Sequence, residues 1–303
     1  MSDNLASLRR KMDGAQKLEG VVRTMKAMAA SSIGQYEAAV SALADYERCV
    51  NLGLSACLRA ERSIGLQQPP RRDGAAVGAI VFGSDQGLVG RFNEVIADFA
   101  TQTLDAIAGR KTVWAVGERV YNHLKDSGMA LAGQFTVPNS VAAITPLIGQ
   151  IQLESEAHRS NGEYSQLYVF HNRFDSAAPY EPVRQRLLPL DASWRQNLTS
   201  LRWPTAKLPE TLSGRDTTLT ALVREHLFIS LYKACAESLA SENGSRLAAM
   251  ERAEKNIESL SAELRQSFYR LRQSSIDEEL FDVIAGFNAL STKTRLPRYE
   301  SHD

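Results

Sequence analysis

The sequence predicts an α/β fold, a doubly wound Rossmann-like domain inserted between two long terminal helices that form an antiparallel coiled coil. Proline is absent from residues 1–68 and 210–296. Because proline interrupts helices, both segments are free to form long ones. Between them, short apolar runs alternate with helical stretches, the pattern of a doubly wound domain. We expect a helix over residues 1–66, an α/β domain over 67–209, a helix over 210–291 and a polar tail over 292–303.

The N-terminal segment carries a narrow apolar seam of the kind by which helices pair in a coiled coil. Its members recur at spacings of three and four residues, with a phase slip before Leu18. Alanine and glycine are frequent, and they permit close approach of a partner while weakening an isolated helix. We therefore expect a partner helix. The seam is Leu5, Leu8, Met12, Ala15, Leu18, Val22, Met25, Ala29, Tyr36, Val40 and Leu43.

The C-terminal segment is expected to supply that partner. A helix over residues 215–291 would be on the order of 110 Å long at about 1.5 Å per residue. An insert that begins and ends on the same side folds its flanking helices back against each other, so we expect antiparallel pairing. The expected seam is Leu219, Leu222, Ile229, Leu239, Leu247, Met250, Ile257, Leu260, Leu264, Phe268, Leu271, Leu280, Val283 and Phe287.

The inserted domain is expected to contain buried strands separated by helices. Short apolar runs at 76–82, 112–116 and 166–171 favour buried strands, and 183–189 adds a further candidate. Helical stretches at 91–107, 117–127 and 145–160 lie between them.

The composition excludes several classes of partner. Lys plus Arg and Asp plus Glu each total 35, so no net charge favours nucleic acid or an anionic membrane. We expect no direct membrane span, since no apolar run is long enough, and the first residues lack the apolar stretch of a secretory signal. Cys49, Cys57 and Cys235 form no C-x-x-C pair and are expected to be buried thiols in a reducing compartment.

A glycine-rich turn at residues 83–93 is the sharpest local motif. It follows an expected strand and precedes an expected helix, where doubly wound sheets bind phosphates. It nevertheless matches neither G-x-G-x-x-G nor G-x-x-x-x-G-K-[ST]. A structural tight turn is favoured over a ligand site. Its key residues are Gly83, Ser84, Asp85, Gly87, Gly90 and Asn93.

Catalytic, cofactor-binding and metal-binding candidates do not emerge from the sequence. The histidines are scattered and have no metal-ligand spacing with each other or with the cysteines. Acidic runs such as 277–279 are typical of a solvated helix face. We therefore expect no catalytic residue, no cofactor and no metal.

Three segments resemble the gamma-subunit family of F-type rotary ATP synthases. Residues 21–31, VVRTMKAMAAS, are similar to the family's I-T-K-A-M-x-M-V-A-A-S/A. Residues 84–93, SDQGLVGRFN, are similar to S-D-R-G-L-C-G-G-F/L-N. Residues 240–250, ASENGSRLAAM, followed by 272–280, RQSSIDEEL, resemble the family's most specific stretch. Their order along the chain matches the architecture already inferred.

The resemblance implies a rotor shaft without an active site of its own. Its implied partners are the alpha and beta subunits of the catalytic hexamer, the epsilon subunit and the membrane c ring. The implied location is the cytoplasmic face of the bacterial inner membrane, peripheral through the complex. The resemblance places Arg23, Met25 and Lys26 near an acidic loop of the beta subunit. It places Arg246, Arg272 and Gln273 at polar contacts with neighbouring subunits.

The chain departs from the family pattern at Arg91, Val89 and Asp277 and continues past Phe287 in a polar tail. These traits resemble the divergent alternate type of bacterial ATPase, whose coupling ion, proton or sodium, is chosen by the c ring. Two other functions stay open. One is a small-molecule enzyme with a ligand at 83–93, dimerised by its terminal helices. The other is a coiled-coil scaffold that self-associates in parallel.

Overall fold

The computed structural model describes residues 2–59, 76–174, 180–190, 192–205, 207, 209 and 214–293. Most of the expected tail, 292–303, lies outside these residues, as do positions 60–66 of the expected first helix. The chain divides into two compact units. We call residues 1–25 and 250–303 the distal unit, and residues 26–249 the head unit. Each unit is described by itself.

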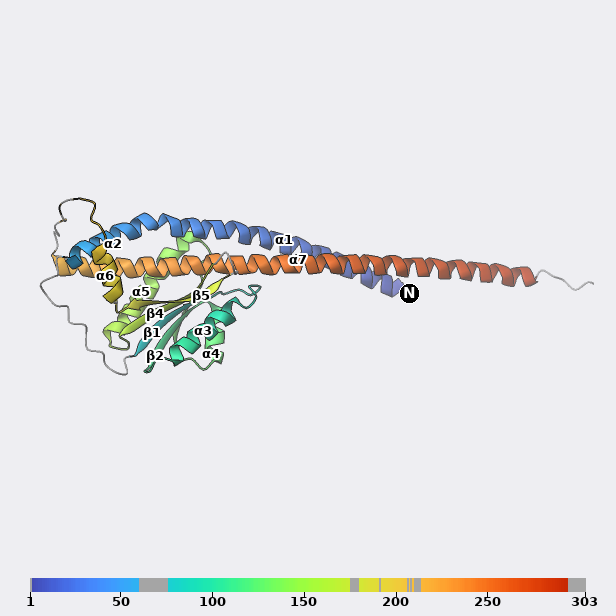
Figure 1. Cartoon of the computed structure of the whole chain (residues 1–303). Coiled ribbons are helices and arrows are strands. Elements are labelled where there is room, and N and C mark those ends of the chain that lie inside the picture. Colours follow the sequence, from blue (N-terminus) through green and yellow to red (C-terminus); the bar gives the residue numbers. More distant parts are fainter. Residues whose placement is uncertain are drawn as a thin grey trace, which may run out of the picture. The chain divides into compact units, whose positions relative to one another are not determined.

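The secondary structure alternates as the sequence predicts. Long helices lie toward both ends of the chain, and the elements between them alternate strand and helix up to β4, which is followed directly by β5 (Figure 1). In chain order the elements are α1 (Ser2–Ala42), α2 (Ala44–Arg59), β1 (Val77–Phe82), α3 (Phe92–Asp105), β2 (Lys111–Val116), α4 (Glu118–Asp126), β3 (Leu131–Phe135), the short 3₁₀ helix η1 (Val141–Ala143), α5 (Ile144–Ser160), β4 (Gln166–Arg173), β5 (Glu181–Leu188), α6 (Ala192–Ser200) and α7 (Arg215–Lys293).

The head unit contains a five-stranded sheet in the order β3-β2-β1-β4-β5. Strands β1 to β4 pair in parallel, and β5 is antiparallel to β4. The order reverses direction between β1 and β4, which confirms the doubly wound class. The four expected strands are present. The sequence reading missed β3 and α6.

Helices cover both faces of this sheet. On one face, α3 and α4 pack on Val77, Ala79 and Val81 of β1. On the other face, α5 and the head part of α7 pack on Ile80 and Phe82 of the same strand (Figure 1). Alternate side chains of one strand therefore enter two separate cores, because successive residues of a strand point to opposite faces.

A third, smaller core joins α2, α6 and α7. Leu54 and Leu58 of α2 pack with Leu198 of α6 and Ile229 of α7. Arg59 closes this core at the end of α2. Its Nε donates to the Thr199 carbonyl at 3.0 Å, and its Nη2 donates to the Leu201 carbonyl. The guanidinium thus satisfies carbonyls at the C-terminal end of α6 that have no partner within that helix.

The terminal helices pair antiparallel within each unit. In the distal unit, Arg23 Nε of α1 lies 3.9 Å from Glu254 Oε1 of α7. In the head unit, Lys233 Nζ of α7 lies 3.9 Å from Glu47 Oε2 of α2. Further along α2, Gly53 lies against Leu222, so within the head unit residues of increasing number on α2 meet residues of decreasing number on α7, as predicted.

The predicted phase slip in the first seam is wrong. Ala15, Val22, Ala29 and Tyr36 are buried at intervals of seven residues. Leu18 is 58% exposed, whereas Glu19 is less exposed and continues the four-three spacing. The seam runs in one register because polar residues with long aliphatic stems occupy positions where the sequence reading required apolar ones.

The first helix is interrupted once, at Leu43, between α1 and α2. The Glu47 backbone N–H donates to the Leu43 carbonyl at 2.8 Å, so helical hydrogen bonding resumes immediately. The interruption separates the part of the N-terminal segment that pairs with α7 from the part that also contacts α6.

Candidate functional site

The glycine-rich turn is held by its own side chains. The Ser84 N–H donates to Asn93 Oδ1 at 2.8 Å, and Asn93 Nδ2 donates to Ser84 Oγ at 2.8 Å. Both residues are buried, Ser84 fully and Asn93 at 6% exposure. This reciprocal pair joins the end of β1 to the first turn of α3.

Asp85 joins the turn to two other segments. Its Oδ1 accepts from the Glu118 N–H at 2.9 Å, and its Oδ2 accepts from the Val137 N–H at 2.9 Å. The first bond places a carboxylate at the N-terminus of α4, where it is favoured by the free N–H groups and the helix dipole. Both carboxylate oxygens are therefore used inside the head.

Two glycines are required by close packing around the turn. A Cβ at Gly83 would lie 2.4 Å from Val120 Cβ, and a Cβ at Gly117, which has φ of 118°, would lie 2.8 Å from the Ser84 carbonyl oxygen. Gly90 has φ of 59°, and Leu88, a residue with a side chain, has φ of 62°. Gly87 meets only the far end of Arg119. The motif glycines thus serve packing and turn geometry at defined positions.

Helix α7 covers part of this turn. Ser245 Oγ donates to the Val89 carbonyl at 2.5 Å, and Val89 is 2% exposed. The side chains of Ser84, Asp85 and Asn93 and the Val89 carbonyl are thus hydrogen-bonded within the head unit, which includes this part of α7. This arrangement favours the structural interpretation of the turn over the ligand site.

The predicted contact residues of α1 differ in exposure. The Arg23 side chain is 67% exposed, and its Nη2 donates to Glu19 Oε1 at 2.8 Å. Met25 and Lys26 are half-buried. Lys26 occupies a seam position and is engaged with a neighbouring group. Arg23 is the member of this trio that presents its charge to the surroundings.

The predicted contact residues of α7 fall into both units. Arg246, in the head unit, has a side chain only 12% exposed, and its Nη2 donates to Glu242 Oε1 at 2.6 Å. Burial raises the pKa of Glu242, and the Arg246 charge opposes this shift. Arg272 and Gln273, in the distal unit, are exposed. The structure therefore pairs Arg246 within its own helix and leaves the other two at the surface.

The end of α7 exposes several large apolar side chains. Helix α1 begins at Ser2, and pairing in the register of Arg23 with Glu254 ends before the last turns of α7. The sequence reading placed Leu280, Val283 and Phe287 in a paired seam, which is wrong. They are 56%, 69% and 70% exposed. The exposed apolar residues of this segment, which we call the apolar end, are Ile276, Leu280, Phe281, Val283, Ile284 and Phe287.

Among the described residues, no group of three or more His, Cys, Asp or Glu side chains is placed to hold a metal ion. None of the described helices is long and apolar enough to cross a bilayer.

These features define a class of protein: a chain whose paired terminal helices carry an inserted α/β domain and whose last helix exposes apolar side chains near its end, as surfaces that contact another molecule do. A family model described as ATP synthase matches residues 4–290, and the chain belongs to this family.

Relatives and solved structures agree with this membership. The ATP synthase gamma chain of Dechloromonas aromatica is 27% identical over 289 residues, covering 93% of this chain and 98% of the relative. The ATP synthase gamma chain of Frankia casuarinae is 28% identical over 309 residues, covering 97% and 100%. A chain of the Euglena gracilis mitochondrial ATP synthase, solved with OSCP, F1 and c-ring, has the same fold, with a TM-score of 0.64, 14% identity and full coverage of both chains. A chain of the Tetrahymena thermophila central stalk and c-ring has a TM-score of 0.54, 22% identity and coverage of 77% of this chain and 99% of its own length.

Proposed function

We propose that this chain is the central rotor shaft, or gamma subunit, of a rotary F-type ATP synthase. Its relatives carry the gamma-chain name, and the chains that share its fold come from ATP synthase rotors and central stalks. The chain is thus part of an enzyme complex. We infer that it contributes rotation and that catalysis belongs to its partners.

The apolar end of α7 is the observation that carries this proposal. Phe281 and Phe287 are each 70% exposed, and such a patch is costly to leave in water. A shaft whose tip enters a ring of subunits would bury these side chains.

The proposed partners are the alpha and beta subunits of the hexamer around the shaft, with the epsilon subunit and the c ring at the head. The proposed location is the cytoplasmic face of a bacterial inner membrane, reached through these partners. The coupling ion, proton or sodium, would be chosen by the c ring.

The six predicted contact residues remain part of the proposal, but they differ in how far their side chains are exposed and paired. Arg272 and Gln273 are exposed, and Arg23 is exposed while it is paired with Glu19. Met25 and Lys26 are half-buried. Arg246 would have to loosen its ion pair with Glu242 before its guanidinium could reach a partner.

The competing functions predict different assemblies. A scaffold that self-associates in parallel is disfavoured because both units pair their helices antiparallel within one chain. The enzyme alternative requires a ligand at residues 83–93, where Ser84, Asp85 and Asn93 are already bonded to the protein itself.

Co-expression tests the proposal directly. The tagged chain is produced with alpha and beta subunits from the same organism, and the recovered complex is weighed and assayed for ATP hydrolysis. We expect three alpha, three beta and one copy of this chain, with activity. Recovery of a homodimer without partners would reject the rotor role.

A variant of the apolar end provides a second test in the same co-expression experiment. Phe281→Ser with Phe287→Ser should weaken recovery of the complex while reducing self-association of the free chain. Phe174→Ser is the matched control, because Phe174 is 44% exposed and belongs to the head. Equal recovery of the double variant and the control would show that the apolar end is not covered by the hexamer.

A further inference from the structure

The two edge strands of the head sheet differ in how they are protected. Strand β5, at one edge, carries Pro182 and the exposed Arg184 and Arg186. Proline and charged side chains on an edge strand hinder pairing with a further strand. Strand β3, at the other edge, has neither, and no charged residue or histidine occurs over positions 127–153. The edge at β3 therefore lacks both of these protections against strand addition.

Strand β3 turns one row of backbone groups away from the sheet. The Phe135 carbonyl accepts from the Gly117 N–H at 2.9 Å, so the backbone groups of Phe135 face the side of β2. The N–H and C=O of one strand residue point to the same side, and successive residues alternate, so those of Gln134 point to the open edge. Among the described residues β3 pairs with β2 alone. The Gln134 backbone is thus placed to bond to an added strand.

A groove of about 480 Å³ lies beside this edge, between the end of β3 and the start of α5. Phe135 and Val137 line it from the strand side, and Leu147 and Gln150 line it from the helix side. The residues that the structure describes around it are all uncharged. A charged side chain that entered the groove would lose hydration without gaining an opposite charge. The groove therefore suits an uncharged side chain.

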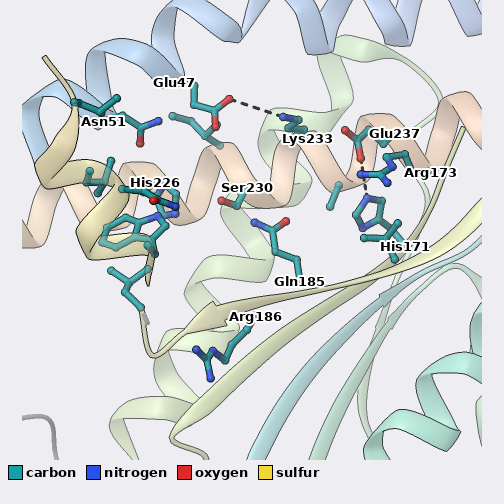
Figure 2. Close-up of a pocket in the computed structure, with 18 residues that line it drawn as sticks. Glu47, Asn51, His171, Arg173, Gln185, Arg186, His226, Ser230, Lys233 and Glu237 are labelled. Atoms are coloured by element: carbon teal, nitrogen blue, oxygen red, sulfur yellow. Dashed lines mark hydrogen bonds and ion pairs between the residues drawn. The ribbon is translucent and has the colours of Figure 1, made fainter. Parts of the chain in front are cut away.

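The larger cavity of the head unit differs from this groove. It has a volume of about 620 Å³ and is lined by α2, α6, α7 and strands β4 and β5. Charged side chains in its lining form pairs within the chain. Lys233 Nζ lies 3.9 Å from Glu47 Oε2, and His171 Nε2 lies 2.8 Å from Glu237 Oε2 (Figure 2). The cavity at the protected edge is thus charged, whereas the groove at the unprotected edge is not.

Helix α5 continues the uncharged surface along the strand. Pro146, Gln150 and Leu153 are exposed at spacings of four and three residues, so they share one face of the helix. Leu153 is 74% exposed, more than either phenylalanine of the apolar end. A strand added beside β3 would gain a second apolar contact from this leucine.

We propose that the edge of β3 and the groove beside α5 bind an extended, uncharged segment of another protein, which joins the five-stranded sheet as an additional strand. The added backbone would bond to Gln134, and its alternate side chains would enter the groove and meet Leu153. In this mode of recognition main-chain hydrogen bonds give affinity and side-chain pockets give specificity. The contact does not depend on the shaft role, because neither α1 nor the apolar end takes part in it.

A second copy of this chain fits the groove less well than another protein does. On the face of the sheet that α5 covers, β3 offers Gly133 and Phe135, which pair with Trp114 and Val116 of the core on that face. Gly133 has no side chain, and Phe135 already packs against its own core. The β3 strand of a second copy would therefore bring no side chain to fill the groove.

Site-specific photo-crosslinking of the full chain, in the cells that naturally contain it, tests the proposal. Benzoylphenylalanine replaces Gln150 in the groove, and the matched control carries it at Gln102, which is exposed on α3. The chain is purified through a tag, and crosslinked segments are sequenced by mass spectrometry. We expect position 150 to label an uncharged segment of another protein at least as long as β3. Co-purification of alpha and beta subunits reports on the shaft role separately.

Three results of this experiment would overturn the proposal. They are the absence of a crosslink from position 150 beyond that of the Gln102 control, a crosslink to a second copy of this chain, and a crosslink to a charged segment.

Gln134→Pro tests whether main-chain pairing holds the segment. It removes the outward N–H without taking a bond from β2, so the fold should be retained. Crosslinking from position 150 should fall about tenfold, the change that corresponds to one lost hydrogen bond at a buried interface. Unchanged crosslinking in a folded Gln134→Pro chain would reject strand addition.

Thr136→Lys replaces this variant if circular dichroism shows that Gln134→Pro does not fold. Thr136 is exposed and lines the groove, so a lysine there places a charge where the added segment has none to match it. Crosslinking should again fall about tenfold. Thr217→Lys, an exposed change near the start of α7, is the matched control and should leave crosslinking unchanged. Equal crosslinking in the two lysine variants would overturn the proposed contact.

Discussion

Asp85 is the residue on which the glycine-rich turn depends most. Its two oxygens accept from Glu118 and Val137, which lie 33 and 52 residues away in sequence. The motif indicated a tight turn from its glycines, aspartate and asparagine. It could not indicate these partners, because they are backbone groups whose side-chain identity carries no signal. Local turn chemistry is therefore readable from sequence, and its long-range hydrogen bonds are not.

Asp85→Asn should destabilise the head by about 2 kcal/mol, because one carboxylate oxygen is replaced by an amide N–H that faces another donor. Urea unfolding followed by circular dichroism measures the loss. Asp126→Asn, an exposed change at the end of α4, should leave the midpoint nearly unchanged. A similar midpoint for both variants would mean that the two bonds contribute nothing to stability.

His226 should make the head sensitive to acid. Burial lowers the pKa of its imidazole below the ordinary value of 6.5. The unfolded chain therefore binds the proton more readily, so the stability contributed above pH 6.5 is lost as the pH falls through the lower pKa of the folded state. His226→Gln removes this titrating group. Unfolding midpoints measured from pH 7 to pH 5 should therefore fall less steeply in the variant than in the wild type.

The control for this pH series is His123→Gln, a change on the outer part of α4. It removes the same type of side chain from a different helix. If His226→Gln retains the full pH dependence of the wild type, the imidazole is not the group responsible.

At the scale of elements, the hydrophobic pattern predicted the strands that are buried on both faces. It missed elements that are partly exposed. Strand β1 is apolar throughout because both faces of the sheet are covered. Strand β3, Leu131–Phe135, is an edge strand with half-exposed residues that include Gly133 and Gln134, so its pattern is weak. Helix α6 is short and covers α2 with few apolar residues.

The coiled coil shows a second limit of sequence reading. Ala15, Val22, Ala29 and Tyr36 are buried at intervals of seven residues, and this repeat is visible in the sequence. The half-buried positions between them include two charged residues, Glu19 and Lys26. If only apolar residues are assigned to the seam, Leu18 is selected in place of Glu19. The outcome was decided by register along the whole helix, since a constant four-three spacing keeps one face toward the partner.

Ala29→Leu tests how closely the helices approach in the head unit. Ala29 is 2% exposed, so a larger side chain would overpack the seam and cost about 1 to 3 kcal/mol. Ala30→Leu makes the same change on the neighbouring exposed position and should shift stability by less than about 0.5 kcal/mol. Thermal unfolding compares the two. Equal midpoints would indicate a loosely packed seam.

At the scale of the whole molecule, the two units differ in how much apolar surface they bury. The largest fully buried side chains, among them Trp114, Phe82 and Phe170, belong to the sheet and its covering helices. The distal unit instead presents Arg272, Gln273 and the apolar end. Such a division suits a subunit that holds its own fold and receives its remaining burial from partners.

Met25→Lys tests the proposed contact between the shaft and an acidic surface of the beta subunit. Met25 is half-buried on α1, so a lysine there would extend its charge toward the partner while its stem stays near the seam. A new ion pair formed in one rotational position would favour that position by about 1 kcal/mol, roughly a fivefold bias. ATP hydrolysis by the complex should continue while ion pumping per ATP falls.

The measurement compares ATP-driven ion uptake with ATP hydrolysis in membrane vesicles that contain the complete complex. Met28→Lys is the matched control, because Met28 is 66% exposed one turn further along α1 and shares the added charge. Raising the ionic strength should restore pumping in Met25→Lys, since an exposed ion pair is screened by salt. If Met25→Lys pumps as many ions per ATP as the wild type, no acidic surface passes this position during rotation, and the contact must be sought at Arg23 or at Arg272 and Gln273.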